Sequence, residues 1–403
     1  MASGVELGDA DRRARDLLIA RAEALAPVFR ERAAATEAAR QMSDATARDL
    51  FDSGLLRYFQ PRRYGGFELD WGIQFDLSRI IGRACPATAW TVGVVGAHAA
   101  FVGRFGQGAQ DDVWGKTPDA LISTGSLRRP GSATQSVDGG YVLDGAWGFA
   151  SGIDHATWAM VPCPVDAGAQ KGEHLHCLVP RQDFTIDDTW HVAGMRGTGT
   201  KDVRVRNIFV PAHRALTRDQ YLGARPPGAA VNPSYVYRAP LAPLRGSNIM
   251  GPLLGAAEGA YQDYVAVTKG RVGAMRGDRP AEDLSVQLRL SESAAELSAA
   301  ALIIETDLRF MRERNRNGIA LTQEERVSHL RDRTFAARLC LTATERLVRQ
   351  MGASGIFRSN PVQRHFRDVS AMSTQIGVNW DFNMPAFARW ALDLPPGDMG
   401  AYA

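Results

Sequence analysis

The residue pattern changes twice along the 403-residue chain, and these two changes constrain the fold more than any single motif. From Ala10 to about Gly54 apolar residues recur at helical spacing, and helical patterns continue through roughly the first 115 residues. After Pro118 glycine, β-branched residues and turn signals dominate, and helical patterns return beyond Pro243. We therefore predict an α+β protein made of an N-terminal helical domain, a middle β domain and a C-terminal helical bundle.

Local signals define these units further. Asp138-Gly139-Gly140 lies between two alternating segments and predicts a β-hairpin, and the alternation over 203–210 predicts a strand that stops at Pro211. Residues 222–243 contain several prolines and glycines and predict a linker or long loop. Four helical segments predict a four-helix bundle: 256–269, 283–314, the stripe Phe335, Leu339, Ala343, Leu347 and Met351, and 361–380. The expected domains are 1–118, 119–232 and 233–403.

Charge and cysteine content exclude several classes of protein. The 47 basic and 44 acidic residues are interspersed and leave a net charge of only +3, which disfavours a nucleic-acid or membrane-surface partner. Four scattered cysteines without a CxxC pair indicate a reducing compartment. The first residues lack the pattern of a signal peptide, and the weakly polar run 89–103 is too short to cross a bilayer, so we expect a cytoplasmic location.

The common catalytic and nucleotide motifs are absent from the sequence. There is no P-loop, GxSxG or HExxH pattern, and the glycine-rich segment 194–200 does not join a strand to a helix as a dinucleotide fingerprint does. His174 and His176 would face one side of a strand and Cys177 the other, so we interpret them as exposed strand residues and predict no metal site.

The helical segment after Pro86 carries a sharper feature. Trp90, Val94 and His98 are spaced by four and would share one helix face, with about 12 Å between the first and the last. That spacing suits a flat tricyclic ring with a substrate beside it. A core tryptophan with a satisfied buried histidine is the alternative.

A motif in the β region carries a resemblance. The segment from Leu143 to Ala156 contains Gly-x-Trp-x-Phe-x-Ser-Gly-x-Asp-His-Ala and resembles the acyl-CoA dehydrogenase superfamily. Within it the chain is similar to two-component, reduced-flavin-dependent monooxygenases such as the p-hydroxyphenylacetate and secosteroid phenol hydroxylases. Matches in the same order include Thr88-Ala-Trp90, Val113-Trp114-Gly115, Met195-Arg-Gly-Thr-Gly199, Phe209-Val-Pro-Ala-His213-Arg and Asn360-Pro-x-x-Arg364-x-x-Arg367-Asp368.

The resemblance implies an acyl-CoA dehydrogenase-like fold, with a middle β-barrel or sandwich, and assigns site residues. Ser151 matches the hydroxyl near flavin N5, Trp90 the tryptophan beside the ring, and His98 an active-site histidine; His98 and Ser151 are the expected catalytic pair. The other residues implied for cofactor binding are Ser123 and Ser126 at the flavin pyrimidine edge, Arg271 at the flavin phosphate, and Gly352 and Gly355 in a turn that meets flavin across a subunit boundary.

The resemblance also implies the chemistry and the partners. Reduced FMN or FAD would react with O2 to give a C4a-hydroperoxide that hydroxylates an aromatic, phenolic small molecule, with Ser151 holding N5–H and His98 taking the phenolic proton. Because the chain lacks a nicotinamide fingerprint, a separate NAD(P)H-flavin reductase would supply the reduced flavin. The implied assembly is a homotetramer.

Two positions depart from the family pattern. Where the dehydrogenases carry a catalytic glutamate this chain has Ile376, which cannot abstract a proton, and where the monooxygenases often carry a histidine it has Gln375. We expect His98, Gln375 and Asn379 to bind substrate, and Asp154 with His155 to be structural. The alternatives are an N- or S-oxygenase acting on an amine, amino sugar or thioether, an acyl-CoA dehydrogenase, and a flavin-free assembly protein.

Overall fold

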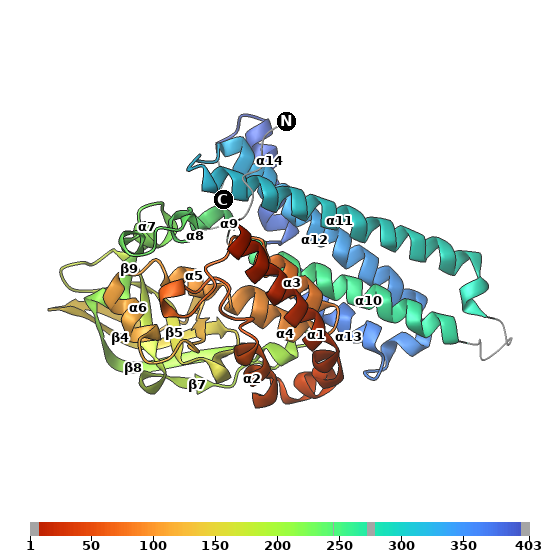
Figure 1. The fold of residues 1–403 in the computed structure, drawn as a ribbon, viewed down its shortest axis with the longest axis horizontal. Coiled ribbons are helices and arrows are strands. Elements are labelled where there is room, and N and C mark those ends of the chain that lie inside the picture. The colour runs from red at the N-terminus through yellow and green to blue at the C-terminus, as the bar shows by residue number, and fades with distance from the viewer. Residues whose placement is uncertain (1–7, 245, 272–278, 396–403) are drawn as a thin grey trace.

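The computed structural model describes the chain except for residues 1–7, 245, 272–278 and 396–403. A β domain lies at one end, the long helices of the C-terminal unit extend to the other, and the N-terminal helices lie between them (Figure 1). The predicted order of helical, β and helical units is confirmed, and we propose 1–118, 119–232 and 233–403 as its domains. The N-terminal helices are α1 (Asp9–Ala39), α2 (Asp44–Asp52), α3 (Ile73–Gly82), α4 (Pro86–Trp90), α5 (His98–Val102) and α6 (Gln107–Trp114).

The helix that was predicted to run from Pro86 past His98 is interrupted. Residues Thr91–Val95 form a π-helical turn in which the Gly96 amide donates to the Thr91 carbonyl five residues earlier. The buried Tyr58 hydroxyl donates to the Val92 carbonyl at 2.5 Å. A Cβ on Gly96 would lie 2.6 Å from that carbonyl oxygen, so glycine is required there. The regular 3.6-residue spacing assumed between Trp90 and His98 was therefore wrong.

The β domain is a sandwich of two sheets. One sheet has the order β1-β5-β6-β9 and the other β2-β4-β8-β7, with β3 paired to β4. The fully buried Trp147 of β4 donates its indole N–H to the Pro162 carbonyl of β5 at 2.8 Å, which ties the sheets together. The predicted hairpin is confirmed, since Val137 pairs with Gly140. The strands are β1 (Ile122–Thr124), β2 (Leu127–Arg128), β3 (Ala133–Val137), β4 (Gly140–Ala150), β5 (Trp158–Pro164), β6 (His174–Pro180), β7 (Thr185–Asp187), β8 (Lys201–Pro211) and β9 (Ala215–Thr217).

The loop predicted over 222–243 contains short helices instead. These are α8 (Tyr235–Arg238) and α9 (Leu241–Leu244), which follow α7 (Arg218–Leu222). The fully buried guanidinium of Arg104 donates to carbonyl oxygens on this segment, at 2.8 Å from both Tyr237 and Ala239. Burial among neutral acceptors lowers the pKa of Arg104 to about 10. The segment is thus packed in place by contacts that are distant in sequence.

The C-terminal unit is the predicted four-helix bundle with one additional helix. It consists of α10 (Met250–Gly270), α11 (Leu284–Arg316), α12 (Gln323–Gln350), α13 (Pro361–Ser373) and α14 (Trp380–Ala391). Thr322 and Glu325 form a capping box at the start of α12, and Asn360 caps α13. The helix predicted over 361–380 ends at Ser373, which leaves Gln375 in the connection to α14. Phe335, expected on the apolar stripe of α12, is 42% exposed.

Buried polar contacts join the three units. Lys201 of β8 donates to Asp154 at 2.7 Å and to Gln41, at the end of α1, at 3.0 Å. Asp368 of α13 accepts the Met195 backbone N–H at 2.6 Å. His155 lies 3.0 Å from the Met42 carbonyl, which agrees with the structural interpretation of this Asp-His pair. These contacts fix the β domain against both helical units.

Burial raises the pKa of Asp368 to about 6. Between about pH 4 and pH 6 the folded chain therefore holds a proton that the unfolded chain has released, so this group lowers stability as the pH rises through that window. Asp368→Asn keeps the acceptor for Met195 and removes the buried charge. We expect the variant to exceed the wild type in unfolding free energy by about 1–3 kcal/mol at pH 7.5 and to match it near pH 4 in denaturant titrations. A less stable variant at pH 7.5 would show that the folded chain uses the carboxylate charge.

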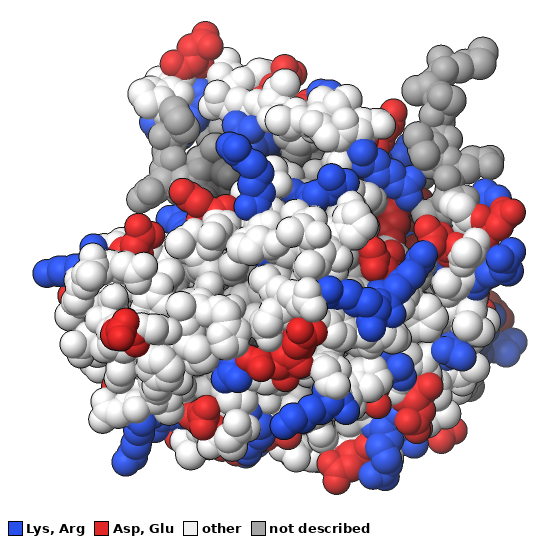
Figure 2. Space-filling model, turned by 60° about the vertical axis from the view of Figure 1, so that its left-hand side comes forward, with Lys and Arg blue, Asp and Glu red and all other residues white. Residues whose placement is uncertain are grey.

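The face of the molecule drawn in Figure 2 shows no concentration of one charge. Lysine and arginine residues are interspersed with aspartate and glutamate over the face seen in Figure 2. Among the helices that the structure describes, none combines the length and apolar character required to cross a membrane. Within the same residues no group of three or more His, Cys, Asp or Glu side chains is placed to hold a metal ion.

Candidate active site

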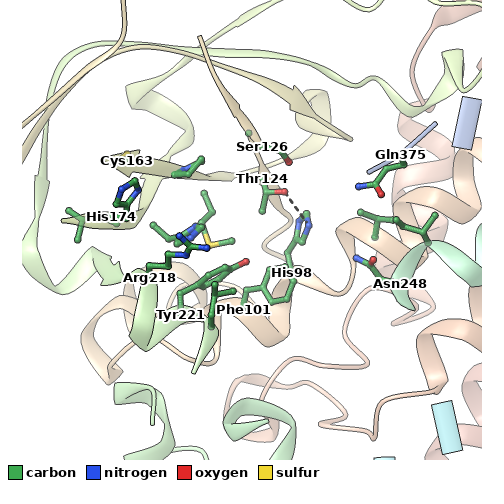
Figure 3. Close-up of a pocket in the computed structure, with 18 of the residues that line it drawn as sticks. His98, Phe101, Thr124, Ser126, Cys163, His174, Arg218, Tyr221, Asn248 and Gln375 are labelled. Atoms are coloured by element: carbon green, nitrogen blue, oxygen red, sulfur yellow. Dashed lines mark hydrogen bonds between the residues drawn. The ribbon is translucent and has the colours of Figure 1, made fainter. Parts of the chain in front are cut away.

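A cavity of about 280 Å³ lies where the helical unit, the β domain and the connection after α13 meet (Figure 3). Trp90, Val94 and His98 all line it, so the predicted shared face exists despite the π turn. Ser126 and Gln375 line the same cavity. The other walls come from β5, β6, α7 and the residues just before α10.

His98 is held by two partners on β1. Its Nδ1 lies 2.7 Å from the Ile122 carbonyl oxygen, which can only accept, so Nδ1 carries the proton in the neutral ring. Nε2 is then the accepting nitrogen, and the Thr124 hydroxyl lies 3.3 Å from it (Figure 3). His98 is 4% exposed. In its neutral form the imidazole therefore has its accepting nitrogen on the side of Thr124, a cavity residue.

Ser151 joins Trp90 to a chain of buried hydroxyls. The Trp90 indole N–H donates to Ser151 Oγ at 3.0 Å, and Ser151 Oγ lies 2.8 Å from Thr200 Oγ1. Thr200 Oγ1 in turn lies 2.6 Å from Thr198 Oγ1, which donates to the Met195 carbonyl at 2.9 Å.

The protons of this chain have one consistent arrangement. Three hydroxyls supply three protons to three contacts, and the Met195 carbonyl supplies none. Thr198 must donate to Met195, Thr200 to Thr198, and Ser151 to Thr200. Because Trp90 occupies one lone pair of Ser151 Oγ, that oxygen has one lone pair left and acts only as an acceptor toward a ligand.

Ser123 and Ser126 have different surroundings. The fully buried Ser123 hydroxyl donates to the Ser151 carbonyl at 2.7 Å and so supports the backbone of that residue. Ser126 is exposed at the cavity, and its amide donates to the Gly148 carbonyl at 2.8 Å. The β1–β2 connection thus places one serine behind Ser151 and the other at the cavity wall.

Gln375 and Asn379, both expected to bind substrate, differ in their position relative to the cavity. The Gln375 side-chain oxygen accepts the Gly377 amide at 2.5 Å, and its NH2 group is the remaining polar part of the side chain at the cavity. Asn379 accepts the Phe382 amide at 3.0 Å and caps α14, and it is not among the cavity residues. Ile376 is 41% exposed and does not line the cavity either.

The three residues expected at the flavin phosphate and subunit boundary lie together, away from the cavity. Arg271 follows α10 and donates to the Met351 carbonyl at 3.3 Å, next to Gly352 and Gly355. These ends of α10 and α12 are at the opposite end of the molecule from the β domain (Figure 1). One subunit therefore does not bring them to Ser151.

Several cavity residues were missed by reasoning from the sequence. Tyr221 stacks on His176 with ring centroids 3.8 Å apart, and both line the cavity with His174 and Arg218. The interpretation of His174 and His176 as exposed strand residues is thus incomplete: His174 is exposed, but His176 is half-buried, and both face the cavity. Cys177 is buried, as expected for the other strand face. The capping box of α7, Thr217 with Gln220, was the one local signal near Tyr221.

Asn248 was also missed, and it carries an unusual polar atom. Its Oδ1 is buried and has no hydrogen-bond partner among the described residues, although Asn248 lines the cavity beside Gln375 (Figure 3). An unsatisfied buried acceptor costs about 1–3 kcal/mol, which proteins tolerate mainly at functional sites. A ligand N–H or O–H would satisfy it.

We expect Asn248→Leu, of similar shape, to keep or raise the unfolding free energy by about 1 kcal/mol while weakening ligand binding about 10-fold. Denaturant titration and binding titrations with reduced flavin and with phenols measure the two effects. The matched control is Asn232→Leu, because the Asn232 side chain donates to the Gly103 carbonyl at 2.7 Å and to Gln110 at 3.0 Å and its loss should destabilise the fold. Destabilisation by Asn248→Leu with unchanged binding would assign Asn248 a structural role.

Comparison with known proteins places this cavity in a family. Residues 15–116 match the model of the acyl-CoA dehydrogenase N-terminal domain, and residues 248–380 match that of the C-terminal domain. The flavin-dependent monooxygenase oxygenase subunit HsaA of Rhodococcus jostii (strain RHA1) is 34% identical over 352 residues, covering 87% of this chain and 92% of that protein. The chain belongs to this family of flavin-dependent monooxygenase oxygenase components.

Two further proteins show how widely the family varies around one fold. The oxygenase component of the FADH2-dependent resorcinol hydroxylase of Rhizobium sp. (strain MTP-10005) is 34% identical, covering 94% of the present oxygenase and 95% of that protein. XiaF from Streptomyces sp., solved in complex with FADH2 and glycerol, superposes with a TM-score of 0.88 at 26% identity, covering 96% and 97% of the two chains. The expected acyl-CoA dehydrogenase-like fold and the expected class of enzyme, a flavin-dependent monooxygenase, are confirmed.

Proposed function

We propose that this oxygenase uses reduced FMN or FAD and O2 to hydroxylate a small phenolic compound in the cavity of Figure 3. The observation that carries the proposal is the presence of two acceptors at one cavity. His98, which lines the cavity, has an accepting imidazole nitrogen, and Ser151, whose accept-only oxygen is bonded to the cavity residue Trp90, lies behind it.

Ser151 fits the reduced form of a flavin. Position N5 carries a hydrogen in the reduced ring and none in the oxidised ring, and Ser151 Oγ has only a lone pair to offer. Phe149, two residues earlier, is held at a φ of 63° with its ring 49% exposed, which provides an apolar surface for a flat ring beside Ser151. When bound, reduced flavin supplies the electrons that activate O2. Trp90, Ser126 and Ser151 are the residues that would hold its ring.

His98 supplies proton transfer to the substrate. Hydroxylation of the ring requires it to be electron-rich, and an imidazole Nε2 within hydrogen-bond distance of the phenol accepts its proton. The Ile122 carbonyl keeps Nδ1 protonated and so keeps Nε2 basic. With its oxygen bonded to Gly377, Gln375 donates to the substrate oxygen from its NH2 group and does not act as a base.

The second group of predicted cofactor residues supports an assembly of subunits. Arg271, Gly352 and Gly355 lie away from Ser151 within one chain, so we propose that they meet the flavin of a neighbouring copy in a homotetramer. Large apolar side chains on the bundle are exposed in the single chain, which supports burial between copies: Leu284, Leu288, Leu302, Ile356 and Phe357. A separate NAD(P)H-flavin reductase would deliver the reduced flavin, and we propose a cytoplasmic location.

Single-turnover oxidation tests the proposal. The oxygenase is mixed anaerobically with reduced FMN or FAD and a panel of phenols, and then with O2. We expect a hydroxylated product, with H2O2 accounting for the rest of the reducing equivalents. Flavin reoxidation at the rate of free flavin without product would contradict the proposal. Product from amines or thioethers but not from phenols would favour the N- or S-oxygenase alternative.

A further inference from the structure

One end of the cavity is cationic, and the proposed proton transfer does not involve it. Arg218 and His174 line this end, and Figure 3 shows them on the side away from Gln375 and Asn248. The residues that line the cavity, all within the described part of the chain, include no aspartate or glutamate. The positive charge of Arg218 therefore faces a space without a protein counter-charge.

Two other arginines of the β domain have a carboxylate partner, unlike Arg218. Arg128 of the same domain pairs with Asp166, and Arg214, four residues before Arg218, pairs with Asp112 at 2.6 Å. The side chain of Arg218 has no hydrogen bond or ion pair with any residue that the structure describes, although Asp219 is adjacent in sequence. A guanidinium in this state is a good receptor for a carboxylate or phosphate, because its planar N–H groups match both oxygens.

The backbone that carries Arg218 is held from several sides. Thr217 and Gln220 form the capping box of α7, which fixes the turn on which Arg218 lies. Tyr221 stacks on His176 of β6. Arg104 donates to the carbonyl oxygens of Gln220, at 3.4 Å, and Gly223. These contacts fix the backbone at Arg218, whose side chain is itself exposed at the open end of the cavity. A ligand there therefore has to order only the side chain and not the backbone.

The middle of the cavity is apolar. Phe101 packs edge-to-face with Tyr221, with ring centroids 5.6 Å apart, and Met160 and Leu175 are nearly fully buried. An aromatic ring fits between these side chains and His98. The cavity therefore offers, in order, a polar end at Gln375 and Asn248, a proton acceptor, an apolar middle and a cation.

We propose that Arg218, with His174 beside it, binds an anionic substituent of the substrate, so that this oxygenase acts on phenols with a short acidic side chain. The proposal rests on the proposed function, since it takes the aromatic ring to lie beside His98. The anion is a carboxylate of the substrate. The phosphate of the flavin is the other possible source of the same chemistry, and the experiment separates the two.

The test compares ligands that differ only in charge. The affinities of 3-(4-hydroxyphenyl)propanoate and of its uncharged amide are measured by titration of the full chain loaded anaerobically with reduced FMN. We expect the wild type to bind the acid at least about 10-fold more tightly than the amide. Arg218→Gln should lower the affinity for the acid to that for the amide and leave the amide unaffected, and Arg218→Lys should restore part of the difference.

The control variant is Arg225→Gln, which removes an exposed arginine of the same connection that does not line the cavity. It should keep the full preference for the acid. Equal binding of acid and amide by the wild type would overturn the proposal. So would an Arg218→Gln variant that weakens binding of FMN but not of riboflavin, because the arginine would then bind the cofactor phosphate. Binding is measured without O2, so its outcome does not depend on whether the ligand is hydroxylated. A failure of the proposed hydroxylation would appear in the single-turnover experiment instead.

Discussion

Replacing His98 with alanine is expected to slow hydroxylation of a phenol by about 10²- to 10⁴-fold. The variant loses Nε2, the nitrogen that accepts the phenolic proton, whereas Ser151 and Trp90 keep their contacts. Reduced flavin should still bind and react with O2, so the reducing equivalents should appear as H2O2. Product and H2O2 measured together in a single turnover give the fraction of reducing equivalents that is used for hydroxylation.

A substrate that is already ionised separates the role of His98 as a base from a positioning role. The ratio of wild-type to variant rate should fall toward one for phenols with electron-withdrawing groups, whose pKa lies below the assay pH. The matched variant is His155→Gln, because His155 binds the Met42 carbonyl and does not line the cavity. An equal loss for ionised and neutral phenols would show that His98 positions the substrate and does not remove its proton.

Replacing Ser151 with alanine is expected to weaken binding of reduced flavin about 10-fold and to shift most of the reducing equivalents to H2O2. The alanine removes the oxygen that accepts N5–H, and it leaves the Trp90 indole N–H without its acceptor. Anaerobic titration measures the affinity, and the yields of product and H2O2 measure the partition. An unchanged partition would remove Ser151 from the site.

Thr200→Val tests the direction of the hydroxyl chain. The variant keeps the Ser151 oxygen but removes the acceptor of its proton, so Ser151 becomes able to donate. The affinity for oxidised flavin should then rise relative to that for reduced flavin by about 10-fold. This ratio is obtained from binding alone and does not depend on turnover. No change in the ratio would show that Thr200 does not set the polarity of Ser151.

The features that could be predicted from the sequence are those that local physics determines. The hairpin at Asp138-Gly139, the start of α4 at Pro86 and the spacing of the bundle helices each follow from backbone preferences or from one apolar face. The resemblance correctly identified the fold and the class of enzyme. Of the site residues that it implied, the structure places Trp90, His98, Ser126 and Gln375 at one cavity, and their roles stay predictions.

The features that were missed depend on contacts between distant segments. The π turn at Thr91–Val95 is accompanied by a hydrogen bond from Tyr58, more than thirty residues earlier. The helices α8 and α9 pack where Arg104 binds their carbonyl oxygens, and prolines and glycines alone predicted a loop there. Asn248 has no local pattern that distinguishes it from any helix-preceding asparagine. Such residues are found only when the surrounding burial is known.

The hydroxyl chain described at Ser151 extends further than the cavity. It starts at the Trp90 indole of the N-terminal unit, passes through Ser151, Thr200 and Thr198, and ends at Met195, whose amide is bound by the carboxyl of Asp368 in the bundle. Each hydroxyl in this series donates toward Met195, so the hydrogen bonds can polarise one another along the chain. The accept-only character of Ser151 therefore depends on residues well behind the cavity wall, and the far end of the series is held by the bundle through Asp368.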